Sequence, residues 1–461
     1  MSPVLRFQVS IDDPAQESGG PSSELARLGA TLDKLRDEMC DIDEKMLAGE
    51  VAVPPSKQPL HAGFAKLPAQ LLDEYEAGRP VSQLGRMLAV TKQLMTEVDR
   101  VVVLADRDFL NGARALLHAC CQPHFNELTR GDRGSRPRLT LVGDSLDNDS
   151  LQGVLQLVGA HRERAAANLD ERWGLVVIAG SSWPGAAGLG CSAFMRALQV
   201  NCGGDERLAS SRTIVIASDS SPAQQASAVL PGAHQFDLPD DVGARYSVLS
   251  LAGLIPAALV GMNVMKLLEG ARAMQAHFAN ARAAENMVLQ YAAVNHLFEV
   301  ERASSLRRWS LWSDRLQSLA DWYQHLLHGS LGQTLKLEQP QPCDDASSGK
   351  RATEEDSSLL HQVVTSRFRF DPLLLQDSSA QSAIARSGFA QTDDSSHNIG
   401  NLVEVCHAAL VKNQQGMVAA GRPVTQLVLP QVDEPSVGQL LQWLMLSSVV
   451  EARLRGRNPY N

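Results

Sequence analysis

The sequence predicts an α/β fold, with a doubly wound parallel sheet flanked by helices and a helical segment before it. Three observations support this class. Short apolar runs rich in β-branched residues alternate with segments of helical periodicity from residue 99 onward. The first hundred residues carry apolar side chains at helical spacing, and 461 residues suffice for two or three domains.

The elements can be predicted in chain order from periodicity. N-terminal helices are expected at 25–39 and 81–99, separated by a connector with Pro54 and Pro55. The first sheet is expected from strands at 99–104, 138–142, 175–178 and 213–217, with helices at 111–121 and 150–157. Ligands of such a sheet bind at the carboxyl ends of its strands.

The second half is less regular. Helices are expected at 264–293, 311–327, 398–411 and 436–454, and strands near 373–375 and 425–429. The stretch 339–358 is polar and rich in Pro and Ser, which predicts a mobile loop.

Composition excludes several classes of function. The formal net charge is -10, which disfavours nucleic acid and anionic membrane as partners because both require clustered positive charge. No apolar run approaches the roughly 20 residues of a membrane span, and the N-terminus lacks the layout of a signal peptide. We therefore expect a cytoplasmic location.

Cysteine and histidine usage gives no indication of a metal site. The seven cysteines include no C-x-x-C pair, so we expect reduced thiols and no bound metal. His325 and His328 are the only histidine pair at helical spacing, and we interpret them as part of a polar helix face.

The segment 240–261, DDVGARYSVLSLAGLIPAALVG, is the most informative part of the chain. It places Arg245 beside a glycine turn, after a strand and at the head of an apolar helix. An arginine there can bind an anion or a developing oxyanion through its rigid charged fork, aided by the helix dipole. The alternative is a capped, buried helix whose arginine pairs with a structural carboxylate.

This segment resembles the signature of the phosphoglucose isomerase family, in which an acidic residue, an aliphatic residue, Gly-Gly-Arg, an aromatic residue and Ser precede an apolar helix with Gly. The matching residues are Asp240, Val242, Gly243, Arg245, Tyr246, Ser247 and Gly253, and Ala244 replaces the second glycine. Strings such as GARALLHACCQPHFNEL and GQLLQWLMLSSVVEARLRGRNPYN resemble the bacterial branch.

The resemblance implies two sugar-isomerase (SIS) domains and isomerisation of a sugar phosphate without a cofactor. It places a helical segment at 1–97, the first SIS domain at 98–275 and the second at 276–461. The implied partners are a sugar or sugar phosphate and a second subunit, either an identical chain or an intact relative. Gly243 and Arg245 are then expected to contact the ligand.

The phosphate loops depart from the family pattern. The first resembles G-I-G-G-S-x-x-G in the family, whereas residues 105–112 read ADRDFLNG and offer only Arg107 as a cation. The second is S-K-S-G-T-T-T in the family and AGSSWP at 179–184 here, which leaves Ser181 and Ser182 as candidate ligands. Glycines and hydroxyls cradle a phosphate, whereas Asp106 and Asp108 repel one.

The acid–base residues depart as well. In the family, a string resembling W-W-K-Q-L-F-G-E carries the glutamate base, and Gly329 stands at its position here. His328 and His361 are the candidate substitutes, because the ring-opening histidine aligns with Ser358 and His361 lies three residues beyond. The family continues past N-P-F/Y with a glutamine and a lysine that reach the substrate, and we expect both to be absent if Asn461 is the natural end.

Three hypotheses follow from these departures. The first is a catalytically impaired or inactive protein with the isomerase fold, kept as a binding or regulatory subunit. The second is an active glucose-6-phosphate/fructose-6-phosphate isomerase with a rearranged site that uses Arg245 with His328 or His361. The third is a binder of an unphosphorylated or cationic sugar attracted by Asp106 and Asp108.

Overall fold

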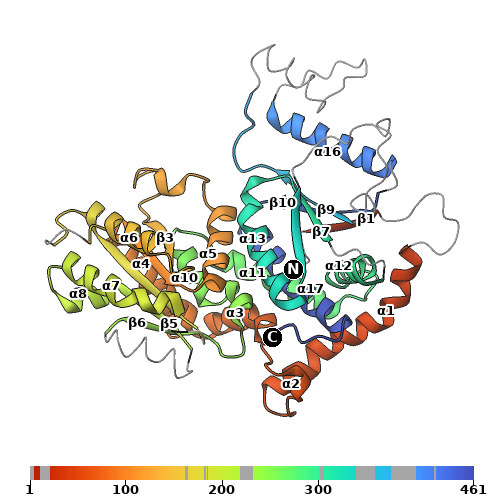
Figure 1. Cartoon of the computed structure of the whole chain (residues 1–461), viewed down its shortest axis with the longest axis horizontal. Coiled ribbons are helices and arrows are strands. Elements are labelled where there is room, and N and C mark those ends of the chain that lie inside the picture. Colours follow the sequence, from red (N-terminus) through yellow and green to blue (C-terminus); the bar gives the residue numbers. More distant parts are fainter. Residues whose placement is uncertain are drawn as a thin grey trace.

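The computed structural model shows two five-stranded sheets in two lobes, with helices around and between them (Figure 1). It describes residues 5–10, 21–160, 165–180, 183, 185–218, 232–301, 306–338, 359–374, 401–419 and 422–461. The predicted mobile loop 339–358 and the candidate ligands Ser181 and Ser182 lie outside these residues.

The first sheet is parallel throughout, with strand order β3-β2-β4-β5-β6. Its strands are β2 (Arg100–Ala105), β3 (Arg138–Val142), β4 (Trp173–Ala179), β5 (Thr213–Ala217) and β6 (His234–Asp237). The four strands expected here are confirmed to within two residues. They are detectable in the sequence because helices cover both faces and leave continuous apolar runs.

The helices of this lobe follow the strands in alternation. They are α5 (Arg107–Cys120), η4 (Phe125–Glu127), α6 (Asn148–Leu157), η5 (Leu169–Glu171), α7 (Gly185–Asn201), α8 (Glu206–Ser211), η6 (Ala244–Leu249) and α10 (Leu251–Leu259). The N-terminal segment packs beside them as α1 (Pro21–Asp37), η1 (Glu38–Ile42), α2 (Asp43–Leu47), η2 (Pro55–Lys57), η3 (Ala62–Ala65), α3 (Leu67–Gly78) and α4 (Gln83–Glu97).

The second sheet has the order β1-β10-β9-β7-β8, and only its β1–β10 pair is antiparallel. Its strands are β1 (Arg6–Ser10), β7 (Leu306–Leu311), β8 (Thr334–Glu338), β9 (Leu360–Arg367) and β10 (Val424–Gln431). The first hundred residues, expected as helix and loop, also contain one strand, since β1 joins this sheet. The strand expected near residues 373–375 was wrong, because Leu374 forms only an isolated bridge with Asn401.

The helices of the second lobe are α11 (Val264–Asn280), α12 (Met287–His296), η7 (Leu297–Glu301), η8 (Asp314–Leu316), α13 (Gln317–Leu331), α16 (Leu402–Ala419) and α17 (Glu434–Leu454). The helix expected at 311–327 therefore begins later, because Leu311 ends a strand. Among the described residues, no helix is both long and apolar enough to cross a membrane.

Two close helix contacts stand out, one within the second lobe and one between the lobes. α11 lies along α17, where a β-carbon on Gly270 would be 2.1 Å from the carbonyl oxygen of Pro435 and one on Gly438 would be 1.9 Å from that of Leu267. Only glycine fits at such backbone contacts. The expected domain boundary at 275/276 falls within α11, so the boundaries remain a prediction. α5 and α13 also pack together between the two sheets (Figure 1).

Candidate functional site

Arg245 lies directly over Gly329, at the junction of the two lobes. It belongs to the 3₁₀ helix η6, whereas Gly329 is near the end of α13. A β-carbon built on Gly329 would be 1.8 Å from Nη1 of Arg245. The guanidinium therefore occupies the space in which a longer side chain at position 329 would begin.

The contacts of Arg245 bear on the alternative in which it pairs with a structural carboxylate. Its Nη2 donates a hydrogen bond to the main-chain oxygen of Asn461 at 2.9 Å, and it forms no ion pair within the described parts of the chain. A structural carboxylate partner is thus not found there. The predicted long apolar helix is also divided, because Ser250 caps α10 by accepting from the N–H of Ala252 after η6 has ended.

Two further contacts hold α13 against the first lobe. Nε2 of His325 is 2.5 Å from Oδ1 of Asp108, at the start of α5. The hydroxyls of Tyr246 and Ser330 are 2.8 Å apart in a buried position, and burial raises the pKa of Tyr246 to about 12. The face of α13 that carries Gly329 is therefore in direct contact with η6 and α5.

The first candidate phosphate loop is filled by an aromatic ring. Phe109 stands where the family motif has serine, and its side chain is 4% exposed. A β-carbon on Gly180, in the second loop, would lie 2.8 Å from Cζ of Phe109. Arg107 is exposed and donates to the carbonyl of Asp144 at 3.4 Å, so it is directed along the surface.

The remaining turn candidate, Gly243, has an ordinary backbone. Its φ of -62° is available to any residue, and its α-carbon faces the ring of His61. The carbonyl of Gly243 accepts from the N–H of Tyr246 at 2.8 Å. Gly243 is the N-cap residue of η6.

Among the described residues, neither His328 nor His361 forms a hydrogen bond or an ion pair with Arg245. His328 is exposed on the last turn of α13. His361 lies in β9, 3% exposed, with Nδ1 2.6 Å from the Thr425 hydroxyl and Nε2 2.9 Å from Oδ1 of Asn295. His361 was expected on a loop, but the structure places it in a buried strand of the second sheet.

The environment of His361 fixes its protonation. Asn295 donates through Nδ2 to Tyr291, so its Oδ1 accepts from Nε2–H of His361, and Nδ1 accepts from Thr425. Burial lowers the pKa of His361 well below its usual value, and the nearby charge of Arg307 lowers it further. The neutral ring is a structural group.

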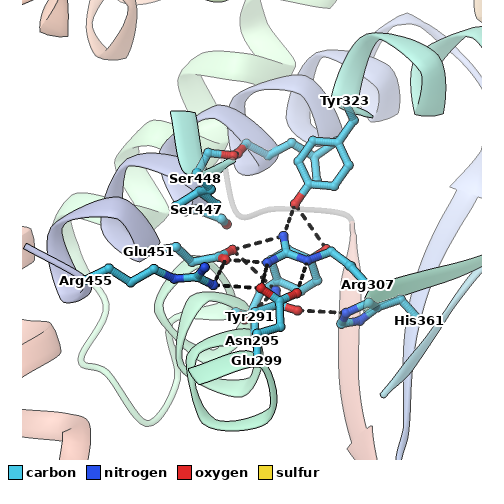
Figure 2. Close-up of polar contacts among 12 residues, drawn as sticks. Tyr291, Asn295, Glu299, Arg307, Tyr323, His361, Ser447, Ser448, Glu451 and Arg455 are labelled. Carbon is cyan, nitrogen blue, oxygen red and sulfur yellow. Dashed lines mark hydrogen bonds and ion pairs between the residues drawn. The ribbon is translucent and has the colours of Figure 1, made fainter. Parts of the chain in front are cut away.

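His361 borders a buried network of charges centred on Arg307 (Figure 2). Arg307 pairs with Glu299 at 2.6 Å and Glu451 at 2.5 Å and donates to Tyr323 at 2.7 Å, while Arg455 pairs with Glu299 at 2.7 Å. Burial alone would lower the pKa of Arg307, but the two carboxylates raise it well above its ordinary value. Two cations and two carboxylates make the network neutral, as burial requires.

Some of these site features could be inferred from the sequence. The glycine at 329 and the aspartates after β2 are visible in it, but the position of Phe109 over Gly180 and of Arg245 over Gly329 requires the tertiary fold. Within the described residues there is no group of three or more His, Cys, Asp or Glu side chains suited to a metal ion.

Comparison with known proteins identifies the family. A family model described as phosphoglucose isomerase matches residues 134–445. The chain belongs to the phosphoglucose isomerase family. It is 23% identical over 386 residues to a glucose-6-phosphate isomerase of Caldanaerobacter subterraneus, covering 82% of this chain and 80% of that one. A glucose-6-phosphate isomerase of Rubrobacter xylanophilus is 30% identical over 231 residues, 49% of this chain and 51% of the relative.

Solved structures agree on the fold. A hypothetical protein from Thermus thermophilus superposes with a TM-score of 0.72 at 21% identity, covering 99% of this chain and 96% of that one. A glucose-6-phosphate isomerase from Chlamydia trachomatis gives a TM-score of 0.67 at 16% identity, covering 99% and 85%. The expected family and its α/β fold with parallel sheets flanked by helices are thus confirmed.

Proposed function

We propose that this chain is a member of the isomerase family that has lost efficient sugar-phosphate isomerisation and serves as a binding or regulatory protein. The observation that carries the proposal is the position of Arg245 over Gly329. The family's proton-shuttling glutamate is matched by a glycine, and the guanidinium occupies the adjoining space. Loss of a general base typically costs roughly 10² to 10⁴ in rate.

Three further features support the proposal. Phe109 fills the space beside Gly180, Asp106 and Asp108 stand where a phosphate would need donors, and His361 is buried in the core. An ionised phosphate placed near two carboxylates would be repelled. These departures concentrate at ligand positions, whereas the buried framework of both sheets is retained.

A binding or regulatory role implies a partner and a location. We propose a dimer, either of two identical chains or with an intact family member, in the cytoplasm. Mass photometry of the purified chain, alone and mixed with an intact isomerase from the same cells, tests whether the dimer forms. Peaks at twice the mass of 49.8 kDa or at the mixed mass are expected, and monomers alone under both conditions would contradict it.

A coupled assay of fructose 6-phosphate conversion tests the loss of activity. The expected turnover is below about 1% of that of an intact family member run in parallel, in keeping with a missing base. Arg245→Ala should leave this residual rate unchanged. Turnover comparable to the intact enzyme, abolished by Arg245→Ala, would overturn the proposal and establish a rearranged active site.

A further inference from the structure

Two adjoining cavities lie beside η3, where the N-terminal helices meet α11 and Tyr460. The larger has a volume of about 300 Å³ and is bounded by α2, η3, α11 and Tyr460. The smaller, about 160 Å³, lies toward α3 and α10. Both are lined by Gly63, Gln70 and Asp241, so Asp241 stands where they meet. Small-molecule sites begin at about 300 Å³.

Most charges around the larger cavity are compensated. Asp43 pairs with Lys57 at 2.9 Å and with Arg453. Lys57 also pairs with Glu38. Glu44 pairs with Lys66. These ion-paired groups and Asp241 together comprise four carboxylates and three cations, which leaves one negative charge. Asp241 forms no ion pair and no side-chain hydrogen bond to another residue in the described parts of the chain.

The carboxylate of Asp241 is held in place by its surroundings. A β-carbon on Gly63 would be 2.2 Å from its Oδ2, so the carboxylate lies directly against the backbone of η3. Burial raises the pKa of Asp241, partly offset by its own main-chain N–H and by His61. In the smaller cavity, Glu74 and Asp237 add negative charge and pair with no described cation.

The rest of the larger cavity offers uncharged contacts. Gln70 and Gln275 present side-chain amides without hydrogen-bond partners among the described residues, so both their donors and acceptors are available. Phe64, Phe278 and Tyr460 also line this cavity and are almost fully buried. Aromatic faces suit both apolar groups and cations.

We propose that these cavities bind a small organic cation of sugar size, with a primary amine against Asp241 and hydroxyls against Gln70 and Gln275. The amine supplies the missing positive charge, the amides hydrogen-bond to the hydroxyls, and the aromatic side chains that line the larger cavity contact the carbon skeleton. This site is separate from the inherited position of Arg245. It deepens the proposed binding role by naming a ligand class, and it rests on that role.

Isothermal titration calorimetry of the full chain with glucosamine, glucose and glucose 6-phosphate tests the inference. Glucosamine should bind, and glucose and glucose 6-phosphate should bind at least about tenfold more weakly because they lack the amine. Asp241→Asn should weaken glucosamine binding about ten- to hundredfold. Asp240→Asn is the matched control, since it removes a neighbouring charge that does not line either cavity, and it should bind as the parent does.

A second variant keeps the test decisive if Asp241→Asn does not fold. Gln275 is only partly buried on α11, so Gln275→Ala should weaken glucosamine binding severalfold while leaving the melting temperature unchanged. Absence of glucosamine binding to the parent chain, equal binding of glucose, or full binding by Asp241→Asn would each overturn the inference. An active isomerase that still binds glucosamine through Asp241 would overturn the proposed function alone.

Discussion

A β-carbon on Gly329 would lie 1.8 Å from Nη1 of Arg245. In the family motifs that the sequence resembles, the first position matches a glutamate and the second matches an arginine. The two positions are physically linked, since the guanidinium of Arg245 takes up space that a side chain at position 329 would need. This contact is the structural basis of the proposed loss of isomerase activity.

The first prediction concerns this pair. Gly329→Ala should gain about 0.5–1 kcal/mol from helix propensity in α13, but in the parent background it displaces Arg245 and its hydrogen bond to Asn461. In the Arg245→Ala background, Gly329→Ala should show the full gain in the free energy of unfolding. Urea unfolding of both single variants and the double variant measures the coupling, expected at about 1 kcal/mol. Strictly additive effects would show that the two residues do not contact each other.

The second prediction concerns the pH dependence of stability. The pKa of His361 is depressed in the folded state, so its stabilising effect is complete above the unfolded pKa of about 6.5 and is lost as pH falls below it. The loss should reach up to about 2 kcal/mol at pH 5. Urea unfolding between pH 5 and 8 should therefore show a steeper pH dependence for the parent than for His361→Gln. Parallel curves would mean that His361 titrates normally in the fold.

The third prediction concerns the network in Figure 2. Arg307→Met leaves Glu299 and Glu451 buried without their main cation and should cost about 3–5 kcal/mol. Glu451→Gln is the matched control, because it removes charge but keeps the shape, and it should cost less. Denaturant unfolding compares them. A smaller loss for Arg307→Met than for Glu451→Gln would show that the carboxylates do not need the arginine.

The fourth prediction concerns the filled loop. Phe109→Ser restores the family's side chain type but leaves a cavity against Gly180, and it should cost about 3 kcal/mol. It should not create affinity for inorganic phosphate, because Asp106 and Asp108 remain. Thermal unfolding with and without a large molar excess of phosphate checks both parts, since a ligand that binds the folded state raises its melting temperature. Phosphate-dependent stabilisation of the variant would show that Phe109 alone blocks the loop.

The first sheet could be predicted from the sequence, and the second largely could not. Strands β2 to β5 are apolar runs, whereas β7 carries Arg307 and Arg308, and β9 carries His361 and Gln362. The two arginines are paired with Glu299, Glu451 and Glu338. His361 and Gln362 are hydrogen-bonded to Asn295 and Asn413. β1 pairs with β10 across more than 400 residues, a partnership that local periodicity does not indicate.

The candidate site also combines features that the sequence predicts with features that only the fold shows. The replacement of the glutamate by Gly329 follows from the aligned motif. Arg245 lies over that glycine because α13 packs against η6. Phe109 lies over Gly180 because α5 follows strand β2 beside β4, and neither contact can be read from local sequence.

Proton exchange at the substrate's C2 position tests the central claim most directly. NMR of glucose 6-phosphate in D₂O with the full chain reports abstraction of the C2 proton without any coupling enzyme. We expect no exchange above that of a protein-free control. Exchange at the rate of an intact isomerase, lost in Arg245→Ala so that contamination is excluded, would contradict the account.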